Sequence, residues 1–192
     1  MTVTRDLLLG LNFVAIDVET ANPYRGSICQ VGMARVRDGK IVKVGARLMR
    51  PPLGAGGGAF AQRNVEVHGI TARAVAGERS FAEQYPWMTG GLGDDLLFAH
   101  NAAFDSDAVT KAAAAEGLPV LDNPWLCTFR LAKSMLALPR FTLDAVAKSL
   151  GLPDFRHHNA EDDAVTAALI LIELAHMNPG VVMGSVQSKR AA

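Results

Sequence analysis

The most informative stretch of the sequence is Phe13-Val14-Ala15-Ile16-Asp17-Val18-Glu19-Thr20. It starts as an apolar, β-branched run, which is typical of a buried strand. Side chains two positions apart on a strand point to the same face, so Asp17 and Glu19 are expected side by side at the C-terminal end of this strand. Two carboxylates held that close in a partly buried place resist ionisation unless a cation lies between them. The alternative is a strand end that reaches solvent, where two acids need no partner.

Length and composition indicate one globular domain over 1–192, with a core over about 12–177 and a flexible tail over 178–192. The hydrophobic share of 49% and the charged share of 20% are ordinary for a globular protein. The 19 basic and 19 acidic residues cancel, which argues against a protein that coats a long polyanion. This balance still allows an enzyme that grips only the end of such a chain.

The sequence predicts a cytoplasmic protein with no membrane partner. No apolar run approaches the roughly 18 residues needed to span a bilayer. The apolar patch Leu7–Leu9 lacks the flanking residues of a secretory signal. Cys29 and Cys127 are expected to stay reduced in such a compartment.

Strand and helix patterns predict an α/β fold with a mixed five-stranded sheet flanked by helices. A three-stranded antiparallel meander comes first, and its second and third strands meet at Asp38-Gly39, a strong signal for a tight hairpin. Residues 51–63 begin with two prolines, contain four glycines between 54 and 58, and are predicted to form a mobile loop of unassigned role. The expected strands are 12–19, 27–37, 41–49, 96–100 and 125–128, and the expected helices are a short one capped by Thr71 and those over 80–88, 103–116, 129–137, 142–150 and 159–177.

Asp105 is predicted to point inward from the first turn of the helix over 103–116. The residues three, four and seven positions further on are Ala108, Val109 and Ala112, which form an apolar stripe. An acid without a partner on such a face is costly. An N-terminal acid favoured by the helix dipole is the alternative, and this residue alone does not decide between them.

The last predicted helix repeats this arrangement at Asp163. The residues four, seven and eleven positions further on are Ala167, Ile170 and Leu174, so this acid also lies on the apolar stripe. Its neighbour Asp162 falls on a mixed face that suits water. The sequence therefore predicts a second helix that carries an acid inward.

Four inward acids on three separate elements favour a metal site. Oxygen ligands suit Mg²⁺ or Mn²⁺, and two such ions about 3.5–4 Å apart stabilise an in-line phosphoryl displacement. His158 lies five residues before the last acid and could deprotonate an attacking water, and His157 competes for this role. A solvated loop histidine is the common alternative for either residue.

Three motifs of the chain resemble those of the DEDDh 3′–5′ exonucleases, a family that includes the epsilon subunit of DNA polymerase III and RNase T. The segment Val67–Thr71 is similar to a further family segment between the first and second motifs. The resemblance covers about 12–176 in the family's order and spacing. The motifs are Asp17-Val18-Glu19-Thr20, His100-Asn101-Ala102-Ala103-Phe104-Asp105 and His158-Asn159-Ala160-Glu161-Asp162-Asp163.

The resemblance implies a ribonuclease H-like fold and a two-metal exonuclease that needs two Mg²⁺ or Mn²⁺ ions. The implied metal ligands are Asp17, Glu19, Asp105 and Asp163. His158 is implied as the general base, because the family places the histidine five residues before the last acid. The expected reaction removes nucleoside 5′-monophosphates from a single-stranded 3′ end, with DNA as the expected polymer.

The resemblance also implies where the substrate lies. The backbone around Thr20 and Ala21 would meet the terminal nucleotide, and Phe104 could hold a base, although core packing is the alternative for its ring. Three arginines in predicted loops near the motifs are candidates for phosphate contact, with solvated loop charges as the alternative; these are Arg25, Arg63 and Arg156.

Other functions stay open at this point. One is an RNA-trimming enzyme with the same chemistry, because any pocket group could contact the 2′-hydroxyl that distinguishes RNA from DNA. Another is a catalytically silent ribonuclease H-like module that binds nucleic acid or a polymerase. The family allows a polymerase partner and a homodimer, and the sequence marks no interface for either.

Overall fold

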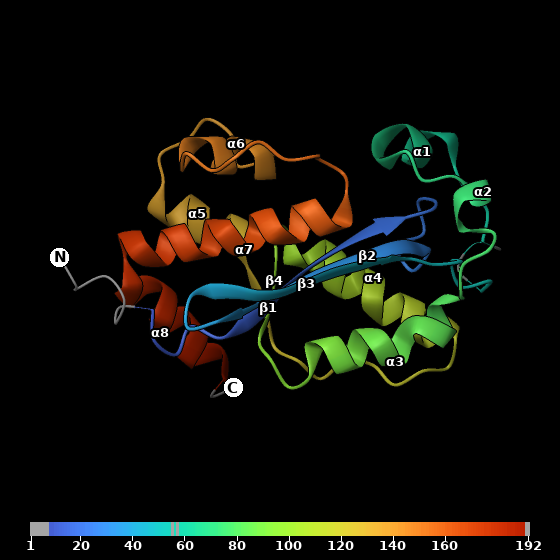
Figure 1. The fold of residues 1–192 in the computed structure, drawn as a ribbon, viewed down its shortest axis with the longest axis horizontal. Helices are drawn as coiled ribbons and strands as arrows, with labels where there is room; N and C mark the ends of the chain where they lie inside the picture. The colour runs from blue at the N-terminus through green and yellow to red at the C-terminus, as the bar shows by residue number, and fades with distance from the viewer. Residues whose placement is uncertain (1–7, 55, 57, 191–192) are drawn as a thin grey trace.

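The computed structural model describes residues 8–54, 56 and 58–190 and places five strands in one sheet between layers of helices (Figure 1). The strand order is β3-β2-β1-β4-β5, with β1 antiparallel to β2 and parallel to β4. This confirms the predicted α/β fold with an antiparallel meander followed by parallel strands. The strands are β1 (Phe13–Thr20), β2 (Ile28–Arg37), β3 (Lys40–Leu48), β4 (Leu97–Ala99) and β5 (Trp125–Cys127).

The predicted hairpin between β2 and β3 is present. Asp38 and Gly39 form its turn with φ angles of 47° and 69°, in the left-handed region that a tight two-residue hairpin requires. The helices of the described chain are α1 (Gln62–His68), α2 (Ala72–Val75), α3 (Phe81–Leu92), α4 (Ala102–Ala115), α5 (Thr128–Met135), α6 (Leu143–Ser149), α7 (Ala160–Met177) and α8 (Pro179–Arg190).

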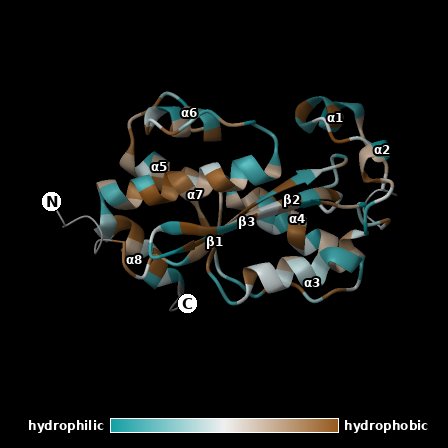
Figure 2. Cartoon of the chain, viewed as in Figure 1, coloured by the Kyte–Doolittle hydropathy of each residue, from teal (hydrophilic) through white to brown (hydrophobic). Residues whose placement is uncertain are grey.

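The alternation of side chains along β1 divides the core in two. Phe13 and Ala15 pack with residues of α5 to α8 on one side of the sheet. Val14, Ile16 and Val18 pack with residues of α3 and α4 on the other side. Figure 2 shows hydrophobic residues along β1 and α7, whereas the first turn of α7 is hydrophilic. Asp17 and Glu19 continue the Phe13 face and so point toward that first turn.

The N-terminus of α7 lies directly on β2 at Gly32. A Cβ atom at Gly32 would be 1.9 Å from the carbonyl oxygen of Ala160, so only a residue without a side chain fits. The Gln30 side-chain oxygen accepts a hydrogen bond from the Ala160 N–H at 3.1 Å, which satisfies one of the free donors at the helix start. Gly32 is the register partner of Asp17, so this contact sets α7 beside the acids of β1.

Helix α3 extends beyond the predicted range 80–88, as far as Leu92. Met88 and Leu92 are one turn apart and both are buried, so core packing holds the second half of the helix. A Cβ at Gly91 would be 2.8 Å from the Met33 side chain. The pair Gly90-Gly91, which on sequence alone favours a helix end, therefore lies inside α3 and lets the helix pack closely against β2.

The end of the predicted loop 51–63 belongs to α1, which the sequence did not predict. Residues 55 and 57 of that loop lie outside the described part of the chain. Helix α1 buries no residue fully and Ala61 before it provides no side-chain cap, so neither an apolar stripe nor a capping signal marks it. It ends at His68, and the following Gly69 caps it with a φ of 75°.

The sequence predicts a flexible tail over 178–192, whereas in the structure the chain turns after α7 and the described part of this segment forms α8. Val182 and Val186 are buried in the same core as α7. The Asn178 side chain accepts a hydrogen bond from the Val181 N–H at 3.3 Å and starts the helix. Among the described helices, none alone is long and apolar enough to cross a membrane, and only α7 and α8 together, bent by 119°, meet the length and composition required.

We expect Gly32→Ala to lower the free energy of unfolding by about 2–3 kcal/mol, because the new methyl group meets backbone that cannot move aside cheaply. Gly45→Ala in the neighbouring strand is the matched control, since its Cβ would lie 3.7 Å from Trp87, an ordinary contact. Urea denaturation of both variants checks this. Equal stability of the two variants would contradict the close contact.

Candidate active site

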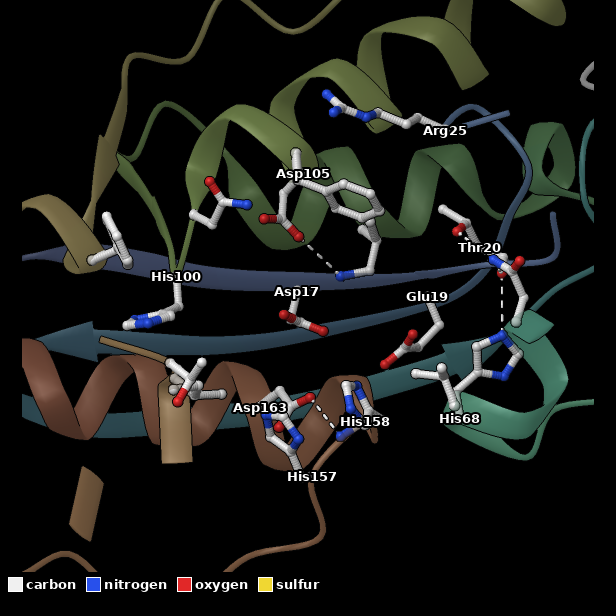
Figure 3. A pocket seen from close by; sticks show the side chains of 18 of the residues that line it. Asp17, Glu19, Thr20, Arg25, His68, His100, Asp105, His157, His158 and Asp163 are labelled. Atoms are coloured by element: carbon white, nitrogen blue, oxygen red, sulfur yellow. Dashed lines mark hydrogen bonds between the residues drawn. The ribbon is translucent and has the colours of Figure 1, made fainter. Parts of the chain in front are cut away.

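One pocket of about 740 Å³ opens at the C-terminal end of β1. Its walls come from β1 and the loop after it, α1, the start of α4, the segment before α6 and the start of α7. In α/β proteins, the carboxyl ends of the strands are a common place for ligand-binding pockets. Figure 3 shows the polar side chains that converge in it, which include Asp17, Glu19, Thr20, Arg25, His68, His100, Asp105, His157, His158 and Asp163.

The structure brings the four predicted acids together. Carboxylate oxygens of Asp17, Glu19 and Asp163 all lie within 4.8 Å of one another, a spacing that could hold a metal ion. Asp105 approaches from the opposite wall, and its Oδ1 accepts a hydrogen bond from the Val18 N–H at 3.2 Å. This bond ties the first turn of α4 to β1, between the two acids of that strand.

Asp163 has one carboxylate oxygen with a partner and one without. Its Oδ2 accepts a hydrogen bond from the His158 N–H at 2.9 Å. Its Oδ1 is buried and has no hydrogen-bond partner among the described residues. A buried carboxylate oxygen without a partner is costly. The donor set of carboxylate oxygens, with one oxygen left over, fits a hard divalent cation.

The acids strongly affect one another's ionisation. Burial raises the pKa of Asp17 well above its usual range, and the charges of Asp105, Asp163 and Glu19 raise it further. Burial, then Asp163 and Asp105, raise the pKa of Glu19 to about 8. Burial also raises the pKa of Asp105 to about 7 and that of Asp163 to about 6. Four such groups cannot all be ionised near neutral pH without a compensating cation.

Both candidate histidines lie beside the acids. Their ring centres are 4.0 Å apart, and each offers a nitrogen within 4.8 Å of an Asp163 oxygen. His158 has a φ of 64°, a left-handed conformation that turns its backbone N–H onto Asp163. Burial lowers the pKa of His158, and His157 and His68 lower it further. His158 is therefore neutral at neutral pH and able to accept a proton.

The predicted substrate residues are placed differently from one another. Thr20 and Phe104 line the pocket. Ala21 does not line the pocket, because it is fully buried. Its N–H donates to the Ser27 carbonyl at 2.7 Å, and its own carbonyl accepts from the Ala61 N–H at 2.8 Å. Its backbone groups serve the loop after β1 and the start of α1.

Helix α1 supplies two pocket residues for which no role was predicted from the sequence. Asn64 Nδ2 donates to the Thr20 carbonyl at 2.8 Å and to Thr20 Oγ1 at 3.2 Å. His68 Nε2 also contacts the Thr20 carbonyl, at 3.1 Å. The family-like segment Val67–Thr71 was the available signal for His68, whereas Asn64 could be found only by predicting α1.

His100 forms a link across the far end of the pocket. Its Nδ1 lies 3.0 Å from Thr128 Oγ1 and its Nε2 lies 2.8 Å from the Phe141 carbonyl. Burial lowers the pKa of His100, so the neutral ring can accept from one partner and donate to the other. The signal was its place in the second motif, five residues before Asp105.

The three candidate arginines separate into two groups. Arg25 and Arg63 line the pocket, on the loop after β1 and on α1. Arg156 instead pairs with Asp162 at 2.9 Å and lines a separate hollow against α7. Only the first two are placed to meet a ligand in the pocket.

Comparison with known proteins agrees with this geometry. Residues 14–171 match the model of the RNase T exonuclease family. A DNA polymerase III of the PolC type from Thermotoga petrophila is 33% identical over 86% of this chain, and the chain spans 12% of that relative's length. Exodeoxyribonuclease 10 of Escherichia coli is 29% identical over 83% of this chain and 66% of its own.

A solved structure has the same fold over nearly its whole length. Exonuclease X, in complex with 5′ overhanging duplex DNA, superposes on this chain with a TM-score of 0.73 at 26% sequence identity. The superposition covers 91% of this chain and 98% of the exonuclease X chain. The family match covers most of the described chain, including all four inward acids. The chain therefore belongs to the DEDDh family of 3′–5′ exonucleases.

Proposed function

We propose that this protein removes nucleoside 5′-monophosphates from single-stranded 3′ ends of DNA. The observation that carries the proposal is the cluster of Asp17, Glu19 and Asp163 with an unpartnered buried oxygen, in a pocket wide enough for a nucleotide. The names of the relatives, a DNA polymerase III and an exodeoxyribonuclease, support DNA as the polymer. The match to part of a PolC-type polymerase supports a polymerase as a partner.

The family depends on divalent metal ions, and the carboxylates of this pocket suit them. In the proposal, Asp17, Glu19, Asp105 and Asp163 hold two Mg²⁺ or Mn²⁺ ions. When bound, such ions stabilise the charge that develops on the phosphodiester and make water a stronger nucleophile. The raised pKa values of the acids are the expected property of a cluster that is completed by cations.

His158 is the proposed general base. Its neutral ring accepts the proton of the attacking water, and its backbone bond to Asp163 fixes it beside the acids. Asp163 Oδ2 accepts this bond, and Oδ1, which has no hydrogen-bond partner among the described residues, can face a cation. His157 lies close enough to be the rival for this role.

Thr20, Asn64 and His68 form the wall beyond Glu19. Their hydrogen bonds tie the end of β1 to α1, so this wall is rigid and can stop the end of a strand. The segment from Phe141 to Leu143 lines the other side and is held by His100. In the proposal the terminal nucleotide lies between these two walls, with the cleaved bond against the acids.

The function is tested by digesting 5′-labelled single-stranded DNA, duplex DNA and RNA side by side with Mg²⁺. We expect stepwise shortening of single-stranded DNA, and a loss of about 10²-fold or more in rate with Asp17→Asn or Asp163→Asn. Asp162→Asn is the matched control, because Asp162 is on the same helical turn but pairs with Arg156. Faster shortening of RNA would favour an RNA-trimming enzyme, and binding without cleavage would favour a silent module.

Metal-free protein should lose stability as pH rises through about 7 to 8, the folded pKa values of Asp105 and Glu19. Their pKa values are raised on folding, so in this range the folded state holds protons that the unfolded state has released, and stability falls with pH. Above about pH 6.5 the histidines with lowered pKa values are neutral in both states and do not oppose this trend.

Thermal unfolding at a series of pH values, in EDTA and in Mg²⁺, measures this effect. Mg²⁺ should raise the melting temperature near pH 8 more than near pH 6, because the carboxylates are then ionised. Asp17→Asn should raise the melting temperature of the metal-free protein, since it removes a buried acid whose ionisation the folded state opposes. A melting temperature that Mg²⁺ leaves unchanged at every pH would contradict a metal site here.

His158→Ala should lower kcat by about 10²-fold or more and flatten the acidic side of the pH profile of the rate. Wild-type activity should fall only below about pH 6.5, because the pKa of His158 is lowered and the neutral ring persists into mildly acidic solution. The matched variant is His157→Ala, with a smaller expected loss. A larger loss with His157→Ala would assign the proton transfer to His157.

A further inference from the structure

Arg25 is placed at the rim of the pocket by the loop between β1 and β2. Gly26 packs this loop onto α4 so closely that an added Cβ would lie 3.0 Å from the backbone at both Lys111 and Ala112. The Arg25 guanidinium carbon lies 5.2 Å from the centre of the Phe104 ring. A half-exposed cation and an aromatic face therefore share one wall of the pocket (Figure 3).

Asp107 on α4 holds Arg25 in this place without binding it tightly. Arg25 Nη1 lies 3.2 Å from Asp107 Oδ2, and Lys111 Nζ lies closer, at 2.8 Å from the same oxygen. Exposed ion pairs of this kind contribute little to stability. Because Lys111 stays with Asp107, Arg25 can turn to another anion without leaving a carboxylate unpaired.

The charge of Arg25 does not serve the acid cluster. Carboxylate oxygens of Asp17, Glu19 and Asp163 lie close to one another, whereas the carboxylate that Arg25 pairs with is that of Asp107, outside this cluster. An arginine that neutralised the reacting phosphate would have to lie against these acids. Arg25 instead lies over Phe104, at the exposed edge.

A single strand that enters this pocket brings negative charge toward four acids. The chain has no net charge to attract it, since 19 basic and 19 acidic residues cancel. A local cation on the entry path would supply the attraction that the net charge does not. Arginine suits this task because its planar group can give several hydrogen bonds to one phosphate, and an aromatic face beside it can stack a base of any sequence.

We propose that Arg25 binds a backbone phosphate of the substrate strand other than the one that is cleaved, with Phe104 as the adjoining base platform. This inference rests on the proposed exonuclease function and adds a strand-binding subsite to it. One guanidinium nitrogen contacts Asp107, and the remaining donors are available to phosphate. Asp107 and Lys111 are positioning residues that keep the guanidinium over the ring.

The test compares Arg25→Gln with wild-type protein on a 5′-labelled oligothymidylate at several salt concentrations. The KM should rise about 3- to 10-fold while kcat at saturation changes less than about twofold, because the lost contact is outside the reacting centre. The slope of log KM against log salt should become shallower by about 0.7, the value for one phosphate contact on a single strand. Arg25→Lys should keep the slope, because it keeps the charge, and should still have a raised KM.

Arg50→Gln is the control for net charge. Arg50 is 52% exposed and pairs with Glu83 at 3.4 Å, outside the lining of the pocket, so its variant should keep the wild-type KM and salt slope. A wild-type slope for Arg25→Gln, or a lower kcat with unchanged KM, would overturn the subsite. If the wild-type protein cleaved no strand, the exonuclease proposal would fail. Fluorescence anisotropy of the same oligonucleotide in EDTA would then still decide the role of Arg25 by the same salt slopes.

Discussion

The close contact of α7 with β2 is the constraint on which the site depends. Gly32 has no side chain and Gln30 accepts the Ala160 N–H, so the first turn of α7 rests on the sheet backbone. Asp163, in that same turn, is thereby brought to the carboxylates of β1. A helix at ordinary distance from a sheet would leave the three acids too far apart to share a cation.

This proximity has an energetic cost that the rest of the fold must offset. Burial raises the pKa values of all four acids, and the charges of neighbouring acids raise those of Asp17, Glu19 and Asp105 further, so the metal-free cluster opposes folding at neutral pH. The two-sided core around β1 supplies the opposing stability, with apolar clusters on both faces of the sheet. Within β1, only the C-terminal half carries acids, and the four residues before Asp17 are fully buried and apolar.

Much of this fold follows from local patterns in the sequence. The period of two in β1, the Asp-Gly turn and the apolar stripes behind Asp105 and Asp163 depend on neighbouring residues, and each is present in the structure. The elements that were missed depend on distant contacts. Helix α8 forms because Val182 and Val186 reach the core of α7, and α1 has no fully buried residue to give it a periodic pattern. The two histidines are adjacent, so only the three-dimensional arrangement could show that both reach Asp163.

The pocket is assembled from β1, α4 and α7, and its acids are separated by long stretches of chain. During synthesis, Asp17 and Glu19 leave the ribosome well before Asp163, and α7 can dock on β2 only after it has been made. A nascent or partly folded chain therefore has two or three carboxylates that are not yet held together. The proposed nuclease activity is then a property of the completed fold alone, and incomplete chains would not expose the cell to it.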